Sequence, residues 1–184
     1  MPDWLKEELK LRDNHTWRAR PGCKIFVADR GAVRFDYPED WVVIPGESSI
    51  NFYDAQPPDD EIHLEVSIMR LPPLDLSGFP VREMIPAAIA GDTRDIQSRG
   101  EIQEQRNGDV EIAWIESEFI DHQLEPRRCY TRVCLARSGT IQPIITMEYW
   151  PEDTDRARAA WDDVLGSLEL GMYIEDPTRG LTLH

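Results

Sequence analysis

Four predicted strands joined by two short turns constrain the fold of this chain more than any other feature. Asn107-Gly108, the dipeptide most typical of a two-residue β-hairpin, separates the first two strands, and Ser138-Gly139-Thr140 separates the last two. The strands are expected at Gly100–Arg106, Val110–Asp121, Arg127–Arg137 and Ile141–Trp150. Strands linked by such tight turns pair with their neighbours in the chain, so these residues predict an antiparallel meander.

Residues Ile62–Leu71 predict a further strand with one covered face and one wetter face. Four apolar side chains alternate there with four mostly polar ones, as a half-buried strand requires. The apolar set is Ile62, Leu64, Val66 and Ile68, and the other set is His63, Glu65, Ser67 and Met69. Short strands are also expected at Thr16–Arg20, Lys24–Asp29 and Ile50–Tyr53.

A strand over Val33–Tyr37 is predicted to end in a proline turn and to be followed by a buried tryptophan. Apolar and charged side chains alternate along this strand. Pro38 ends it, because proline has no N–H to donate to a neighbouring strand. Trp41 follows the turn, so we expect its indole to enter the core there and to anchor the hairpin.

Two helices are predicted within the body of the chain. Asp153–Leu168 carries six apolar residues at helical spacing, a stripe that belongs on a sheet. These are Ala157, Ala160, Trp161, Val164, Leu165 and Leu168. Pro80–Ile89 predicts a second helix, which Pro86 either breaks or forces to start late.

The two ends of the chain are predicted to lie outside this body. Asp3–Leu11 is expected to be a short helix with Trp4, Leu5 and Leu9 on one side, which either docks on the domain or pairs with another chain. Met172–His184 has no clear period, so it is expected to be a tail or a crossing arm.

The charge of the chain excludes several classes of partner. It has 35 acidic and 20 basic residues, and its formal net charge is −15. Such a surface repels phosphate, so neither nucleic acid nor an anionic membrane is an expected partner. The sequence shows no signal peptide and no stretch long enough to span a membrane, so a cytoplasmic location is expected. A basic protein surface fits the charge better.

No motif in the sequence points to catalysis. It contains no G-x-S-x-G elbow and no glycine-rich phosphate loop. Cys23, Cys129 and Cys134 are odd in number and include no C-x-x-C pair, so we expect reduced thiols, with Cys129 and Cys134 on opposite sides of one strand. No cofactor, metal ligand or catalytic residue is therefore expected, and a binding protein is favoured over an enzyme.

Two segments resemble the PsbP-like fold family. They are Phe35-x-Tyr37-Pro38-x-x-Trp41 and the closing helix Trp161-x-x-Val164-Leu165-x-Ser167-Leu168. That family includes the lumenal extrinsic subunit of photosystem II, a yeast Ran-binding nuclear-transport protein and bacterial chaperones of secretion effectors. The resemblance covers about residues 23–170 and implies an antiparallel sheet between helices, in proteins that mostly hold other proteins. It transfers no catalytic or metal-binding residue.

These observations predict an α+β domain with an antiparallel sheet of six or seven strands flanked by helices. The expected organisation is an N-terminal helix and strand extension over residues 1–22, one PsbP-like domain over residues 23–170, and a C-terminal tail over residues 171–184. The expected assembly is a monomer or a homodimer.

One candidate partner surface follows from the wetter strand face. His63, Glu65 and Met69 are expected to join Glu116 and Glu118 of a neighbouring strand in a shallow acidic surface for a basic or amphipathic protein segment. The predicted function is a non-catalytic protein-binding or chaperone-like module. The alternative is a metal- or small-ligand-dependent enzyme that uses His63 and nearby carboxylates.

Overall fold

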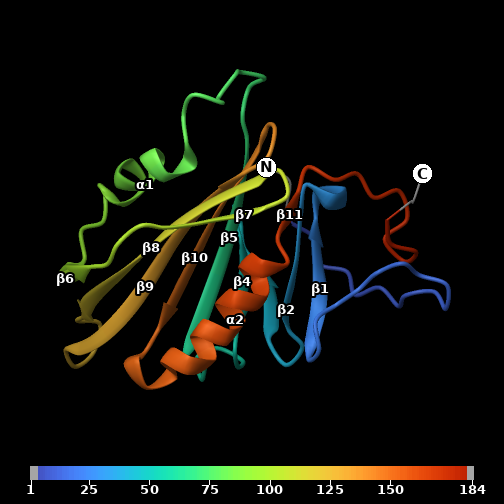
Figure 1. The fold of residues 1–184 in the computed structure, drawn as a ribbon. Coiled ribbons are helices and arrows are strands. Elements are labelled where there is room, and N and C mark those ends of the chain that lie inside the picture. Colours follow the sequence, from blue (N-terminus) through green and yellow to red (C-terminus); the bar gives the residue numbers. More distant parts are fainter. Residues whose placement is uncertain (1–3, 182–184) are drawn as a thin grey trace.

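A computed structural model describes residues 4–181 and shows an α+β fold with two antiparallel sheets and two helices (Figure 1). The larger sheet has eight strands in the order β3 (Val42–Pro45), β4 (Ile50–Tyr53), β5 (Ile62–Arg70), β10 (Ile141–Tyr149), β9 (Arg127–Arg137), β8 (Val110–Asp121) and β6 (Asp95–Arg99), with β7 (Gln103–Asn107) also paired to β8. The smaller sheet has the order β1 (Cys23–Ala28), β2 (Val33–Pro38) and β11 (Glu169–Leu170).

The predicted meander is confirmed, but the number of strands is larger than the six or seven expected. β8 and β9 have the predicted bounds, and Gly108 takes the positive φ of 58° that a tight hairpin turn requires. The segment before the hairpin is divided into β6 and β7, and both pair with β8. Strands β1 and β2 do not join the main sheet but form the separate smaller one (Figure 1).

Helix α2 (Thr154–Gly166) lies across one face of the larger sheet, as its apolar stripe predicts (Figure 1). All six residues of the stripe are buried. They pack in one cluster with the side chains that β2, β4, β5 and β10 turn toward the same side. Trp41 is also buried in this cluster, which confirms the anchoring expected after the proline turn.

Helix α1 (Val81–Ile89) covers the opposite face, over β8 and β9. Its buried residues Val81 and Ile85 pack against Ala113, Ile115 and Leu135. The helix continues through Pro86, so the break or late start considered from the sequence does not occur. Residue 86 is exposed, and its missing N–H leaves the packing of the buried side intact.

Two expectations for the N-terminal region are wrong. Residues 4–11 form no helix, and no strand forms at Thr16–Arg20; Asp3 lies outside the described residues. Instead, residues 12–17 run beside the C-terminal tail: the backbone N–H of Thr16 donates to the carbonyl of Arg179 at 2.7 Å. The indole Nε1 of Trp17 donates to the carbonyl of Pro177 at 2.7 Å. The described part of the tail is therefore an arm that is hydrogen-bonded to the N-terminal region.

No helix among the described residues is long and apolar enough to cross a membrane.

Candidate protein-binding groove

A partly apolar hollow lies where the edges of the two sheets face each other. On one side is β1, an edge strand of the smaller sheet, and on the other is β3, an edge strand of the larger sheet. The cavity between them has a volume of about 490 Å³. We call it the edge groove. Its floor and walls come from β1 and from Tyr37, Val43, Pro45 and Ile50.

The floor of the edge groove is the open side of an aromatic cluster. Phe26 packs against Phe35 with 4.8 Å between ring centroids, and against Phe52 with 5.0 Å in an edge-to-face arrangement. Tyr37 contacts Phe52 at 5.2 Å. Phe35 and Phe52 are fully buried, whereas Phe26 and Tyr37 are only partly buried. The hydrophobic core therefore reaches the surface between the two edge strands.

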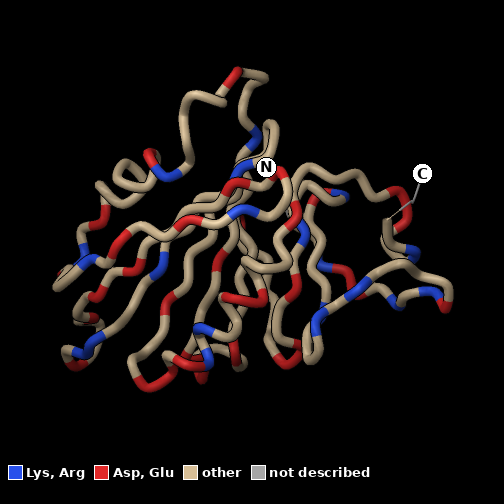
Figure 2. The backbone as a smooth tube through the Cα atoms, in the orientation of Figure 1, with Lys and Arg blue, Asp and Glu red and all other residues tan. Residues whose placement is uncertain are grey.

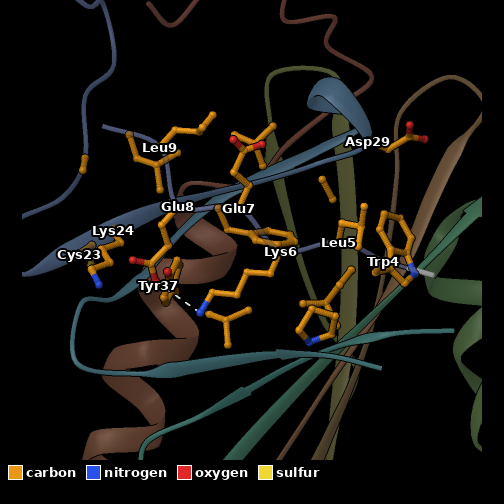
Figure 3. A pocket seen from close by; sticks show the side chains of 18 of the residues that line it. Trp4, Leu5, Lys6, Glu7, Glu8, Leu9, Cys23, Lys24, Asp29 and Tyr37 are labelled. Carbon is orange, nitrogen blue, oxygen red and sulfur yellow. Dashed lines mark ion pairs between the residues drawn. The ribbon is translucent and has the colours of Figure 1, made fainter. Parts of the chain in front are cut away.

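Residues 4–11, which we call the N-terminal strap, lie over this opening in an extended conformation (Figure 3). Trp4 is partly buried and packs against the core. Burial raises the pKa of Tyr37, and the negative charge of Glu8 in the strap raises it as well. Leu5, by contrast, has 92% of its surface exposed. Within residues 4–181, no backbone hydrogen bond joins the strap to β1 or β3.

Cys23 lies at the rim of the edge groove, and its thiol is expected to be poorly reactive. Burial and the carboxylate of Asp163, 3.5 Å from the sulfur, together raise the pKa of its thiol to about 11. A thiol with such a pKa is almost entirely protonated at neutral pH, so it is a poor nucleophile. Cys129 and Cys134 are buried and reduced, on alternate sides of β9 as expected.

The structure corrects the partner surface predicted from the sequence by dividing it between two faces of the sheet. His63, Glu65 and Met69 of β5 lie on the α1 side, because His63 is paired through β10 and β9 with Ser117 of β8. Glu116 and Glu118 flank Ser117 and therefore point to the α2 side. Two strands separate β5 from β8, a distance that the sequence did not reveal.

Glu116 and Glu118 are engaged in ion pairs. The Nε of Arg132 donates to Glu116 at 2.7 Å, and the hydroxyl of Tyr149 donates to the same oxygen at 2.5 Å. Glu118 pairs with Arg128 at 3.0 Å. The buried guanidinium of Arg132 also lies 5.1–5.5 Å from the ring centroids of Trp114, Tyr149 and Trp161. No pattern in the sequence predicts this cluster.

His63 borders a separate polar cleft of about 850 Å³, which is also lined by Thr93, Arg94 and Glu148. Its ring stacks on Tyr53, and its Nε2 lies 2.9 Å from the side-chain oxygen of Asn51. Arg94 stands in the cleft between Asp92 and Glu148 and forms ion pairs with both. In the part of the chain that the structure describes, no three His, Cys, Asp or Glu side chains are grouped to hold a metal ion.

A family model named Alr1449 matches residues 24–174 of this chain. The chain belongs to the Alr1449 family. The uncharacterised protein alr1449 of Nostoc sp. is 43% identical over 178 residues, which are 97% of this chain and 93% of that protein. This relative has no named activity, so family membership adds no chemistry to the site.

Solved structures place the Alr1449-family chain in the PsbP/Mog1-like fold. Cyanobacterial PsbP from Synechocystis sp. superposes with a TM-score of 0.53 at 12% identity, over 83% of this chain and 95% of that one. A mutant form of Mog1 gives 0.52 at 10% identity, over 80% and 95%. A Bacteroides thetaiotaomicron protein gives 0.58 at 16%, over 82% of this chain but 49% of that one. The expected PsbP-like fold is confirmed, and these identities show the fold alone.

Proposed function

We propose that this protein is a non-catalytic protein-binding, chaperone-like module, and that the edge groove holds an apolar or amphipathic segment of its partner. The observation that carries this proposal is that the groove already holds such a segment. The strap reads Trp-Leu-Lys-Glu-Glu-Leu-Lys-Leu, mixes large apolar and charged residues, and lies extended over the groove.

The contact between the strap and the groove leaves apolar surface on both sides incompletely covered. Trp4 is the strap residue that packs on the core, while Leu5, Leu9 and Leu11 remain exposed to different degrees. Fully burying one large apolar side chain contributes roughly 1.5–3 kcal/mol, so a partner that seats two or three such residues binds better than the strap. Exposed apolar patches of this kind mark interaction sites.

The charge of the molecule favours a basic partner. The chain has 35 acidic and 20 basic residues, and the acidic positions are spread over much of the backbone trace (Figure 2). A net charge of −15 steers cationic segments toward the protein and slows the approach of anionic ones. Long-range attraction would therefore raise the association rate of a basic segment, and the apolar floor would hold it.

Affinity capture from the native lysate tests the proposal with three full-length baits. Wild-type protein and Met69→Ala, which changes the exposed β5 face, are expected to retain one common protein. Phe26→Ser, which puts a hydroxyl on the groove floor, is expected to lose it while its circular dichroism remains that of the wild type. Retention by Phe26→Ser and loss by Met69→Ala would move the site to the face that carries His63, Glu65 and Met69. Capture of nothing above a charge-matched control would contradict the proposal.

A second candidate function is an enzyme or receptor for a small ligand in the polar cleft. The observation in its favour is that His63 lies there beside Glu148 and borders the cleft with Asp60 and Glu61. Calorimetric titration with zinc and manganese tests its metal-dependent form. Absence of heat with either ion would remove that form.

A further inference from the structure

We propose that the N-terminal strap is an intramolecular competitor for the edge groove, displaced by a partner peptide that adds a strand to the free edge of β1. This inference rests on the proposed function and specifies how that site is regulated and what it recognises. The partner is an extended amphipathic segment with an aromatic residue at one end and a net positive charge.

The first step is the unpaired edge of β1. All six residues of β1 pair with β2 on one side, from Cys23 opposite Pro38 to Ala28 opposite Val33. Among residues 4–181, no strand pairs with its other side. Every residue of β1 borders the edge groove. Unpaired backbone groups along an edge strand are a template for another extended chain.

The second step is the choice between the two edges. β3 is also an edge strand, but it has four residues and ends at Pro45, which has no N–H to donate. β1 has six residues and contains no proline. An added strand therefore gains a longer and uninterrupted ladder of backbone hydrogen bonds on β1 than on β3.

The third step is the way in which the strap is held. Beyond the strap, the N–H of Arg12 donates to the carbonyl of Thr178 at 3.0 Å, which ties the chain to the C-terminal arm. At the other end, Trp4 packs on the core. Between these points the strap makes no backbone hydrogen bond to β1. A peptide that pairs with β1 makes contacts that the strap lacks, and the strap can leave without opening the fold.

The fourth step is the side-chain pattern of the partner. Its aromatic residue takes the position of Trp4, because that seat is the part of the groove that reaches the core. Alternate side chains of an added strand point to one face, so apolar residues two apart would cover Phe26 and Tyr37 while the others remain in solvent. Basic residues suit those outer positions, given the charge of the molecule.

The test uses the full-length protein and a labelled synthetic peptide with the sequence of residues 3–12, Asp-Trp-Leu-Lys-Glu-Glu-Leu-Lys-Leu-Arg. Fluorescence anisotropy measures its affinity for the wild type, for Trp4→Ala and for Leu5→Ala. Trp4→Ala frees the groove, so it is expected to bind the peptide roughly tenfold more tightly than the wild type. Leu5→Ala changes an exposed side chain of the same strap and is expected to match the wild type.

Three results would overturn the inference. The first is equal affinity of the wild type and Trp4→Ala for the peptide, and the second is equal binding of a peptide whose tryptophan is alanine. The third is hydrogen exchange on peptide addition that slows at residues 42–45 and not at residues 23–28. Failure here together with Phe26-dependent capture from lysate leaves the proposed function standing. Tighter peptide binding by Trp4→Ala, together with capture of no partner from lysate, would support the role of the strap as a competitor and contradict the proposed function.

Discussion

The charged residues of β2 illustrate how single side chains connect separate parts of this protein. Arg34 and Asp36 point away from the aromatic cluster, yet they are 4% and 1% exposed. Their charged groups lie 2.7 Å apart. The N–H of Arg20 donates to the Asp36 carboxylate at 2.8 Å, and the N–H of Asp36 donates to the Ser167 hydroxyl at 2.7 Å. The pair therefore joins β2 to the N-terminal region and to the end of α2.

Replacing Arg34 with methionine is expected to lower the free energy of unfolding by roughly 3–5 kcal/mol, because it leaves the Asp36 carboxylate buried without its partner. Urea unfolding followed by circular dichroism measures this change. Arg158→Met is the matched control, since Arg158 is exposed and lies 3.9 Å from a fully exposed Asp155. It is expected to change stability by less than about 1 kcal/mol. Equal effects of the two substitutions would contradict the role of the buried pair.

Asp163→Asn is expected to speed the reaction of Cys23 with a thiol reagent at pH 8. Burial and the Asp163 carboxylate raise the pKa of this thiol to about 11, so its thiolate fraction at pH 8 is about 100-fold smaller than that of a thiol at the ordinary value of 9.0. Removing the carboxylate charge lowers the pKa and increases the thiolate. Stopped-flow absorbance from pH 7 to 10 measures the rate, with Asp162→Asn as the control. A pH profile unchanged by Asp163→Asn would refute the assignment.

The alternation of apolar and charged residues at positions 33–37 predicts the strand, but it does not predict that side chains on both faces of the strand are buried. A period-two pattern with charged members usually places those members in solvent. The charges at positions 34 and 36 are buried because the end of α2 and the N-terminal region cover them, and neither contact leaves a mark near these residues in the sequence. Trp41 was placed correctly because it begins an apolar run, Trp41 to Ile44, that the sequence shows directly.

Elements bounded by strong local signals were predicted well. Asn107-Gly108 and Ser138-Gly139-Thr140 define the hairpins, and the β8 and β9 bounds follow from them. β6 was missed because Asp95–Arg99 is mostly exposed and carries no apolar alternation. It exists because β8 offers it backbone partners. The expectation that the strap is helical was wrong. Apolar residues at positions 4, 5 and 9 have helical spacing, but the same residues also suit an irregular segment that lies over an exposed part of the core.

The partly covered groove and the divided partner surface share one cause. Local alternation defines the two faces of a strand, but it does not say which face of one strand matches which face of another. The pairing register across β5, β10, β9 and β8 decides that His63 and Glu116 lie on opposite sides. Long-range pairing also leaves β1 and β3 as edge strands of two different sheets, which face each other across the groove. Neither the match between strand faces nor the facing of the two edges can be predicted from local sequence patterns.

Helix α1 offers a test at the scale of one element. Pro86→Ala is expected to raise the free energy of unfolding by about 1–3 kcal/mol, because it restores a donor N–H inside the helix and removes the clash of the ring with the preceding turn. Residue 86 is exposed, so no packing is lost. Thermal unfolding measures the change, with Ala87→Gly as a control expected to be destabilising by up to about 1 kcal/mol. A lower melting temperature for Pro86→Ala would show that the ring itself stabilises the helix.

At the scale of the whole molecule, the arm formed by residues 171–181 fixes the N-terminal region. Gly180 adopts a φ of +95°, and a Cβ placed on it would lie 2.5 Å from the Thr16 hydroxyl. The indole of Trp17 is buried under the same arm. The two terminal regions therefore hold each other, and the strap ends just before Arg12, where this contact begins.

Gly180→Ala is expected to loosen both partners of this contact together. Amide hydrogen exchange measured by mass spectrometry should become faster in residues 12–17 and in residues 172–181, while β8 and β9 keep their protection. Gly78→Ala is the control, because a Cβ there meets open space and the φ is ordinary. Faster exchange in only one of the two segments would show that they are held independently.

The hydrogen bond from the Thr16 side chain to Arg179 spans 163 positions along the chain. During synthesis from the N-terminus, residues 12–17 are made long before residues 177–179, to which they dock. The residues of the aromatic floor are therefore synthesised well before the contact that anchors the strap to the C-terminal arm can form. A binding partner present during translation would meet the groove before its own strap is anchored, and the order of events in the cell would then decide which of the two occupies it first.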